Sequence, residues 1–569
     1  MENNKNFFLA IALSMMVVVV YQLIFPPSQP TNPPITEEGV QVNTPTSSTQ
    51  TTVNNPITND PGVSSTSSQQ VDGAEQEIAR PVVEIVKVES PLYSIELSTQ
   101  GGVISSMNLK EYNYSSEQKI PIYSFIWDFV TGQTTTKPEQ DLDRKVNMVN
   151  EGLSDLNKSL NFTVEEGKTI YYTSAVSSLT VNGTKSLNLV GSMANGLRIE
   201  KTLVFEPDSY VIKMNVKVTN SESNDRSLSP VIFLGGGNEP IIYDPPPNEI
   251  KGVSQYDTEF DTYTTSDIVE TQFGGINFDW IGITSHYFAV LLKKPNNNWN
   301  FDFKRVELPI SHGGLTPLGL LAGVPSILKT GEVWKSDFEF YLGPKDTEYM
   351  DKFDIRTVNT LEMTFTIIAQ PMINLLRWFY QFTKNWGVSI ILLTFVVRLL
   401  ILPLAYKGMK SMKRMGKVTP KIQALKAKYK DDKERFNKEV MEMYKKQKIN
   451  PMGGCLPLLV QIPVFIALYS ALMPAIELRH SPFIFWIDDL SQQDYTMILP
   501  LLCGSTMFFQ QMITPTPATI DPMQKKIMRF FPIMMFAFFA FTSSGLVLYW
   551  TISGFVSVLQ QYVFNKYNP

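Results

Sequence analysis

The 569-residue sequence has few cysteines and histidines, the residues that form disulfide bonds or bind metals. It contains only two cysteines, Cys455 and Cys503, and both lie in apolar runs of the last third. The polar first half has none, so no disulfide bond can stabilise it. The three histidines are far apart, and no Cys-x-x-Cys or Cys–His cluster occurs. We therefore expect neither a zinc site nor a redox site, and no metal or cofactor.

The sequence also lacks the motifs of enzymes that hydrolyse nucleotides or esters. There is no Walker motif, no nucleophile elbow and no metal-ligand spacing. The triplet Gly235–Gly237 stands outside the strand–loop–helix context that a dinucleotide-binding loop requires. We expect a protein that is not an enzyme and has no small-molecule substrate. Its work would then come from binding and from hydrophobic partitioning.

Long apolar runs and a segregation of charge are present instead. The net charge is −5, but residues 26–357 are strongly acidic and residues 358–569 are strongly basic. The run Phe7–Phe25 contains no charged residue. It is long for a signal peptide and no small-x-small cleavage pattern follows it. We therefore expect residues 1–25 to be an uncleaved transmembrane anchor, with a cleaved signal peptide as the alternative.

Two regions of different character follow the anchor. Residues 26–80 are rich in Pro, Thr, Ser, Asn and Gln, which predicts a flexible linker outside the membrane. Residues 81–357 show the period-two alternation of half-buried strands, for example at Ile212, Met214, Val216 and Val218. The Asn-Gly pairs at 182–183 and 195–196 are typical of hairpin turns. We predict an all-β domain built as a two-sheet sandwich, ending in a short helix at 346–357.

Residues 358–384 have helical periodicity. Met372, Leu375, Leu376 and Phe379 recur at helical spacing, opposite Asn374, Arg377 and Gln381. Trp378 and Tyr380 are aromatic residues of the kind found at membrane boundaries. This pattern predicts an amphipathic helix on the outer membrane–water interface. A helix in the core of the sandwich is the alternative.

Five further apolar segments occur in the last third, at 387–404, 455–475, 497–509, 527–541 and 546–564. The third and fourth are short enough to form either two spans or a re-entrant pair, since about 13 helical residues reach only about 20 Å. The loop 405–450 contains 15 Lys and Arg against five Asp and Glu, which predicts a cytoplasmic location. We therefore predict an α-helical polytopic membrane protein with six spans and both termini cytoplasmic. Residues 26–383 would lie outside.

The loop 407–450 is expected to form a basic helical hairpin on the cytoplasmic face. Thr419-Pro420 is typical of a helix start and Asp431-Asp432 of a turn. Apolar residues recur at helical spacing on each side of this turn, at Val418, Ile422, Leu425, Tyr429, Phe436, Val440 and Met443. The basic surface fits anionic lipid, ribosomal RNA or an acidic nascent chain. A solvated face without a specific partner is the alternative.

Arg398 is the most informative residue, because it lies inside the apolar segment FVVRLLILPL. An arginine in the middle of a membrane helix costs about 2.5–3.5 kcal/mol on insertion scales. No Asp or Glu occurs in the five apolar segments, which argues against a proton relay or a static ion pair. We interpret Arg398 as facing water and awaiting a negative group. The alternative is a side chain that reaches the headgroups.

Other polar residues in the apolar segments extend this interpretation. Thr394 lies one helical turn before Arg398, and Gln461 lies in the middle of the third span. The last span contains several more, namely Thr551, Ser553, Ser557, Gln560 and Gln561. Together they would line a hydrated hollow around Arg398. Hydrogen bonds between helices are the alternative for each of them.

Six motifs in residues 385–564 point to a known family: NWGVSIILLTFVVRLLILPL, TPKIQALK, NPMGGCLPLLVQIPVFIALY, ILPLLCGSTMFFQQM, DPMQKKIM and SGLVLYW. These motifs resemble those of the YidC family of membrane protein insertases, and the outer β-rich domain resembles its Gram-negative branch. The resemblance implies insertion and folding of nascent inner-membrane proteins, alone or with the Sec translocon. It also implies a periplasmic β-sandwich, a five-helix insertase core at 385–569 and contact with the ribosome through cytoplasmic loops.

The resemblance also implies roles for individual residues. Arg398, Thr394, Gln461, Tyr549 and Trp550 correspond to a substrate-binding groove, and Trp550 stands where a tyrosine is frequent. Three residues correspond to an apolar surface along which a substrate helix slides, namely Phe465, Cys503 and Phe538. A methionine is usual at the position of Cys503. The chain lacks a long basic tail after the last span, so ribosome contacts would fall to the inner loops.

Two functions from other classes compete with an insertase. A membrane transporter or channel is the main alternative, but it usually has paired repeats and acidic coupling residues, and we find neither. A sugar-processing activity of the outer domain would need converging His and carboxylate residues. The sequence does not show that His286 and His312 converge.

Overall fold

The computed structural model describes most of the chain after residue 81. The described residues are 82–113, 143–150, 152–165, 168–193, 195–236, 250–268, 274–295, 298–308, 315–429, 432–447, 456–514 and 522–567. The predicted anchor at 1–25 and the predicted linker at 26–80 lie outside them. All elements described below belong to one unit of the chain, which includes Val83–Pro569.

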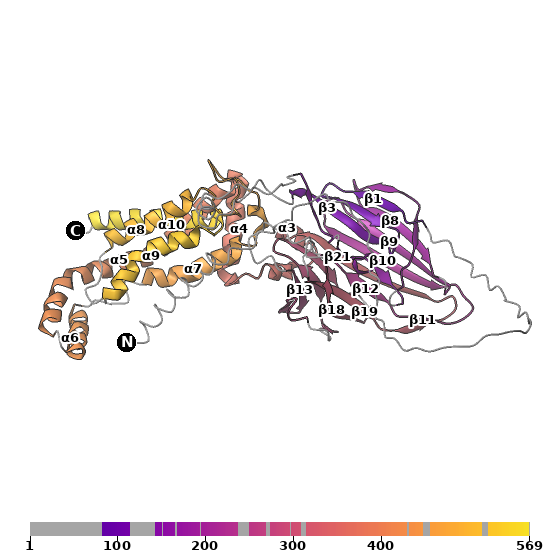
Figure 1. Ribbon diagram of the computed structural model, residues 1–569, viewed down its shortest axis with the longest axis horizontal. Helices are drawn as coiled ribbons and strands as arrows, with labels where there is room; N and C mark the ends of the chain where they lie inside the picture. Colours follow the sequence, from indigo (N-terminus) through magenta and orange to yellow (C-terminus); the bar gives the residue numbers. More distant parts are fainter. Residues whose placement is uncertain are drawn as a thin grey trace, which may run out of the picture. The chain divides into compact units, whose positions relative to one another are not determined.

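The first part of this unit is built from strands, as the sequence predicts (Figure 1). The largest sheet has nine antiparallel strands in the order β14 (Glu259–Tyr263), β13 (Lys251–Tyr256), β16 (Trp280–Thr284), β17 (Phe288–Lys293), β21 (Val333–Pro344), β10 (Val211–Asn220), β9 (Leu197–Phe205), β8 (Lys185–Ser192) and β6 (Tyr172–Ser174).

Three smaller sheets complete the β-rich domain. One has the order β4 (Lys145–Asn147), β3 (Val103–Asn113), β2 (Tyr93–Ser98), β1 (Ile85–Glu89) and β7 (Ser178–Thr180). Another has the order β15 (Gly274–Gly275), β18 (Trp299–Glu307), β19 (Leu315–Gly323), β12 (Val231–Leu234) and β5 (Phe162–Thr163). The third pairs β11 (Arg226–Leu228) with β20 (Ser326–Leu328).

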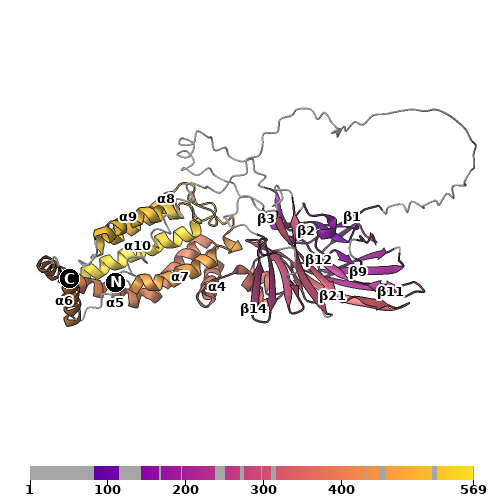
Figure 2. The ribbon, with the colours of Figure 1, turned by 60° about the horizontal axis from the view of Figure 1, so that its bottom comes forward.

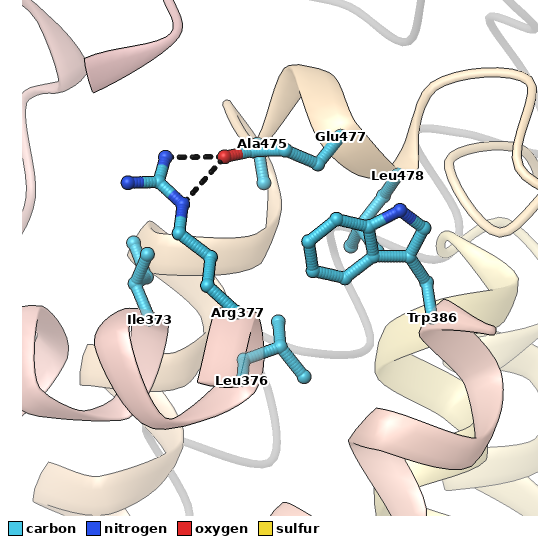
Figure 3. Close-up of a pocket in the computed structure, with 7 residues that line it drawn as sticks. All are labelled: Ile373, Leu376, Arg377, Trp386, Ala475, Glu477 and Leu478. Atoms are coloured by element: carbon cyan, nitrogen blue, oxygen red, sulfur yellow. Dashed lines mark hydrogen bonds and ion pairs between the residues drawn. The ribbon is translucent and has the colours of Figure 1, made fainter. Parts of the chain in front are cut away.

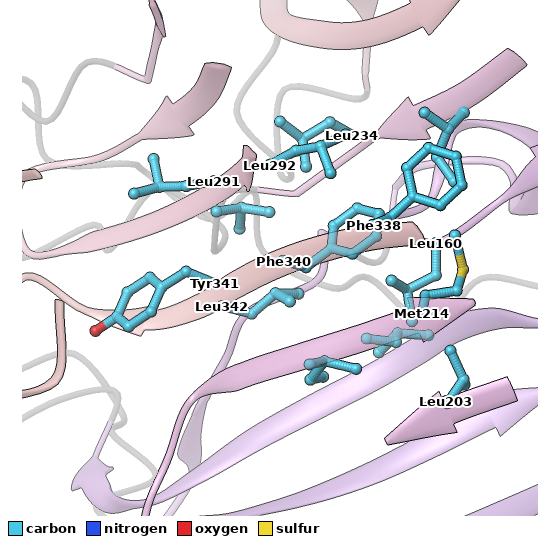
Figure 4. Close-up of a cluster of buried hydrophobic side chains, with 14 of the residues drawn as sticks. Leu160, Leu203, Met214, Leu234, Leu291, Leu292, Phe338, Phe340, Tyr341 and Leu342 are labelled. Carbon is cyan, nitrogen blue, oxygen red and sulfur yellow. The ribbon is translucent and has the colours of Figure 1, made fainter. Parts of the chain in front are cut away.

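The alternating pattern of β10 places one row of its side chains in a shared core. Met214 and Val216 are buried, whereas Asn215 between them and Lys213 before them are exposed. Met214 lies opposite Leu203 on β9 and Phe338 on β21, so the three apolar side chains meet on one face (Figure 4). The same buried cluster includes side chains from all three larger sheets. The sheets therefore pack on one core, as expected of layered β domains.

The hairpin prediction holds for one of the two Asn-Gly pairs and fails for the other. Asn195-Gly196 joins β8 to its partner β9, and Gly196 has a φ of +80°, so the hairpin prediction is confirmed. Asn182-Gly183 joins β7 to β8, which belong to different sheets. The hairpin prediction is wrong there, because the local turn signal carries no information on which sheet the next strand enters.

A short helical region ends the β-rich domain, as predicted. It consists of α3 (Thr347–Met350) and the 3₁₀ helix η3 (Ile355–Leu361). The Asp346 carboxylate caps α3 by accepting a hydrogen bond from the Glu348 backbone N–H at 2.9 Å.

Helices make up the rest of the described chain. They are α4 (Thr366–Thr383), α5 (Trp386–Lys428), α6 (Lys433–Lys446), α7 (Leu456–Leu472), α8 (Ile498–Ile513), α9 (Pro522–Phe539) and α10 (Ser544–Tyr567), with the 3₁₀ turn η5 (Ile476–Leu478) after α7. In both views α5, α7, α8, α9 and α10 run side by side (Figures 1 and 2). Among the described helices, α5 and α10 are long and apolar enough to cross a membrane. The 16 residues of α8 reach only about 24 Å.

Helix α5 corrects one sequence-based expectation. It continues for 43 residues through Pro403 and Pro420, so the prediction that a separate helix starts at Thr419-Pro420 is wrong. An internal proline removes one backbone donor, but the hydrogen bonds on either side keep the helix continuous. The first arm of the basic hairpin is therefore a direct extension of the helix that carries Arg398. The predicted apolar residues of both arms other than Tyr429 do pack together, around Ile422 and Val440.

Helix α4 lies against other helices and not in the core of the β-rich domain. Its residues Met372 and Leu376 join the buried cluster of α5 and α10, and Ala369 and Ile373 pack on α7. Trp378 on its other side is 51% exposed. The alternative of a sandwich-core helix is therefore wrong.

Candidate functional site

Arg398 on α5 is half-buried against α10. Its Nε donates a hydrogen bond to Ser553 Oγ at 2.7 Å, and its Nη2 donates to the same oxygen. Among the residues that the structure describes, no carboxylate forms an ion pair with Arg398. A guanidinium has five N–H donors, so one serine hydroxyl leaves most of its capacity unused.

A second polar contact lies one turn earlier on α10. Gln461 of α7 donates from Nε2 to the Tyr549 hydroxyl at 3.0 Å, and both side chains are buried. Tyr549 and Ser553 are four residues apart and so share one face of α10. The structure thus brings Arg398, Gln461 and Tyr549 together. With Ser553, we call these residues the polar strip.

Thr394 and Thr551 are not part of this hydrogen-bonded strip. The Thr394 hydroxyl donates to the Ile390 carbonyl of its own helix at 2.7 Å, and the side chain is fully buried. The Thr551 hydroxyl likewise donates to the Val547 carbonyl at 2.8 Å. Hydroxyls bonded to their own helix in this way keep only acceptor capacity for other groups.

The candidate apolar residues lie along a row of aromatic rings. The Phe465 ring of α7 meets Trp550 of α10 with centroids 5.2 Å apart, and Trp550 meets Phe539 of α9 at 5.5 Å. Phe539 in turn meets Phe538 at 5.4 Å. We call these four residues the aromatic row. Trp550 therefore lies between the two predicted sliding contacts, and Phe539 is a member that sequence reasoning missed.

Cys503 does not lie on this row. Its side chain on α8 has no exposed surface and belongs to the buried cluster of the helices. The apolar signal in its sequence segment is the same for a buried and for an exposed position, so sequence reasoning had no means of separating the two.

The outer surfaces of the helices are strongly apolar. Leu399 and Leu400, the two residues after Arg398, are 67% and 74% exposed. Phe555 on α10 and Phe530 on α9 are 59% and 62% exposed. Apolar surface of this extent is typical of helices that face lipid. Arg398 therefore lies on α5 between the exposed apolar side of this helix and the other residues of the polar strip.

The hairpin of α5 and α6 presents a basic surface. Its exposed cations are Lys407, Lys410, Arg414, Lys417, Lys421, Lys426, Lys428, Arg435, Lys438, Lys445 and Lys446. Their positive potential favours polyanionic partners and anionic headgroups.

The histidines do not form a catalytic cluster in the described structure. His286 Nε2 lies 2.9 Å from the Met473 carbonyl oxygen, and burial lowers the pKa of His286 to about 4. His286 is thus a neutral packing residue next to the end of α7. His312 lies outside the described residues.

Comparisons with known proteins agree with the two halves of the fold. The family model described as "YidC periplasmic domain" matches residues 85–375, and the one described as "60Kd inner membrane protein" matches residues 378–569. The chain is 31% identical over 575 residues to the membrane protein insertase YidC of Syntrophus aciditrophicus, covering 99% of both chains. It is 32% identical over 592 residues to that of Pelobacter propionicus, again covering 99% of both.

A further relative and a solved structure have the same description. The chain is 33% identical over 490 residues to the membrane protein insertase YidC of Oleidesulfovibrio alaskensis, covering 84% of this chain and 85% of that one. A crystal structure of an active YidC insertase aligns with 84% of this chain and 95% of its own at 15% identity, with a TM-score of 0.34.

Proposed function

Because this chain belongs to the YidC family of membrane protein insertases, we propose that it inserts proteins into the membrane by way of the polar strip and the aromatic row. The chain is an insertase and not an enzyme, and its β-rich domain corresponds to the family's periplasmic domain.

The polar strip would receive the hydrophilic part of an arriving protein. The observation that carries this proposal is that Arg398, within the described residues, has one serine as its hydrogen-bond acceptor and no carboxylate partner. A cation with spare donors in an apolar environment stabilises a carboxylate or a backbone carbonyl strongly. Arg398 would lower the cost of bringing such groups into the bilayer. Tyr549 and Gln461 would add weaker polar contacts.

The aromatic row would receive the apolar segment of the same protein. Phe465 and Phe538 are partly exposed at its two ends, so a substrate helix can contact them from the lipid side. Transfer of the segment's apolar surface out of water lowers the free energy by about 25 cal/mol per Å². This transfer would drive the step without nucleotide hydrolysis. The short α8, whose 16 residues reach only about 24 Å, would thin the bilayer near the site and so reduce the remaining barrier.

We also propose the topology and partners that the sequence predicts. The chain would cross the inner membrane six times, with both termini cytoplasmic and residues 26–383 periplasmic. The basic hairpin of α5 and α6 would then face the cytoplasm and contact the ribosome or anionic lipid. Larger substrates would be handled together with the Sec translocon.

The experiment that tests the aromatic row is site-specific photocrosslinking. A photoreactive residue at Phe465 or Phe538 should crosslink to the apolar segment of a stalled nascent membrane protein. The same residue at Phe509, which is 56% exposed on α8 but not in the row, should crosslink at least fivefold less. Equal yields from all three positions would mean that the substrate has no preferred path and would refute the assignment.

A further inference from the structure

Residues 476–479, which follow α7, contact both the β-rich domain and the helices. Ile476 is buried in the core of the β-rich domain, whereas Leu478 is buried in the core of the helices. The Arg479 guanidinium lies over the Tyr287 and Phe288 rings, 5.6 and 5.8 Å from their centroids. Residues two positions apart thus enter different cores, so this segment cannot shift without disturbing both.

Glu477 provides the link to α4. Its carboxylate accepts a hydrogen bond from Arg377 Nε at 2.8 Å and another from Arg377 Nη2 (Figure 3). The same guanidinium donates to the Thr347 hydroxyl and lies 3.8 Å from Asp346 Oδ1. One arginine on α4 therefore joins η5 to the first turn of α3. The Arg377 and Glu477 side chains are only 27% and 14% exposed, so solvent screens this pair less than a surface pair.

The electrostatics of Glu477 match this geometry. Burial raises the pKa of the Glu477 carboxyl, Arg377 opposes that rise and Asp346 adds to it. Arg377 therefore stabilises the charged form of this buried carboxyl group. Loss of Arg377 would leave a buried acceptor without its main partner, which is costly.

The outer part of α7 is tied down at further points. Ser470 accepts a hydrogen bond from the Thr364 backbone N–H at 3.0 Å, and Ala471 is buried against Ala369 of α4. Phe465 lies five residues before Ser470 on the same helix, or about 8 Å along its axis. A shift of the outer end of α7 would therefore displace Phe465.

We propose that Arg377 and Glu477 are positioning residues that hold the outer end of α7, and with it Phe465, in place for the substrate. The pair acts through the helix and does not touch the substrate. This proposal rests on the proposed function of the aromatic row. It gives the outer domain and α4 a role in insertion, because both share the guanidinium that holds η5.

The test measures position and substrate contact separately. Spin labels at Trp378→Cys on α4 and Tyr469→Cys on α7, both exposed positions, report the distance between these helices in a background without native cysteines. Glu477→Gln keeps the side-chain volume and one oxygen acceptor, and Arg377→Met keeps the apolar stem. Both should broaden the distance distribution. The crosslinking yield from Phe465 should fall at least threefold relative to that from Phe538, which is not on α7.

Two controls complete the test. Arg356→Met removes an arginine of η3 whose carboxylate partners, Asp354 and Asp279, lie on neither α4 nor α7, and it should leave both readouts unchanged. Arg377→Lys keeps the positive charge beside Glu477 and Asp346 and should give a narrower distribution than Arg377→Met. Unchanged distances and an unchanged Phe465 to Phe538 ratio in Glu477→Gln and Arg377→Met would overturn the proposal. If an otherwise wild-type chain does not crosslink from Phe465 or from Phe538, the proposed role of the aromatic row is wrong. The distances between α4 and α7 still test whether Arg377 and Glu477 hold α7 in place.

Discussion

Replacement of Arg398 by alanine should reduce the insertion of substrates with acidic translocated loops by about tenfold or more. The Arg398 guanidinium is the cation of the polar strip and can bind a carboxylate of the substrate. If it lowers the barrier by only about 1.4 kcal/mol, its loss costs a factor of ten. Substrates with uncharged loops should lose less than threefold. The measurement is protease protection of the two substrate classes in inverted membrane vesicles.

Two variants control for this result. Arg398→Lys keeps the charge but not the planar fork, and we expect it to retain part of the activity on acidic loops. Arg529→Ala removes an exposed arginine of α9, outside both the polar strip and the basic hairpin, and should leave both substrate classes within twofold of wild type. If Arg398→Ala inserted acidic and uncharged loops equally well, the charge of Arg398 would have no role in insertion.

Replacement of Asp494 by alanine should destabilise the helical part by about 3 kcal/mol or more. Asp494 is 3% exposed, and its carboxylate accepts hydrogen bonds from the Leu499 N–H at 2.7 Å and the Thr496 N–H at 2.9 Å. It also accepts from the Thr496 hydroxyl at 2.6 Å and from Trp486 Nε1 at 3.2 Å. Hydrogen bonds to charged groups contribute about 1.5–3 kcal/mol each, although not additively.

The Asp494 variant should also affect the position of α8. The same loop accepts a hydrogen bond at the Leu490 carbonyl from the Gly545 N–H at 2.8 Å, which ties it to the start of α10. We expect a fall in Tm of about 5 °C or more for the whole chain in detergent. Faster hydrogen exchange should appear in the first turn of α8. Asp488→Ala, at an exposed position of the same loop, should change Tm by less than about 2 °C. Equal Tm values for both variants would show that the Asp494 hydrogen bonds do not hold this loop.

The sequence was sufficient to predict the features that depend on local periodicity. The alternation at Met214 and Val216 identifies the buried face of β10, because successive side chains of a strand point to opposite faces. The cost of an unpaired Arg398 in an apolar segment likewise follows from sequence alone. Helical spacing identified Ile422 and Val440 as packing partners.

Features that depend on contacts between distant segments were not accessible in this way. Arg377 and Glu477 are 100 residues apart, and neither sequence segment points to the other. Thr394 looks like a groove residue by spacing, but its hydroxyl is bonded to its own helix. Cys503 looks like a surface contact, but it is buried between helices. Pro420 looks like a helix start, whereas α5 continues through it. In each of these cases tertiary packing decides between local alternatives of similar energy.

The most direct test of the central claim, that the polar strip around Arg398 receives hydrophilic groups from the cytoplasm, is thiol labelling of Arg398→Cys in a chain without its two native cysteines. A membrane-impermeant maleimide added to the cytoplasmic face of inverted vesicles should modify this position. It should not modify Leu399→Cys, which lies on the lipid-facing side of the same turn. Labelling of neither position, or of both at the same rate, would contradict the account.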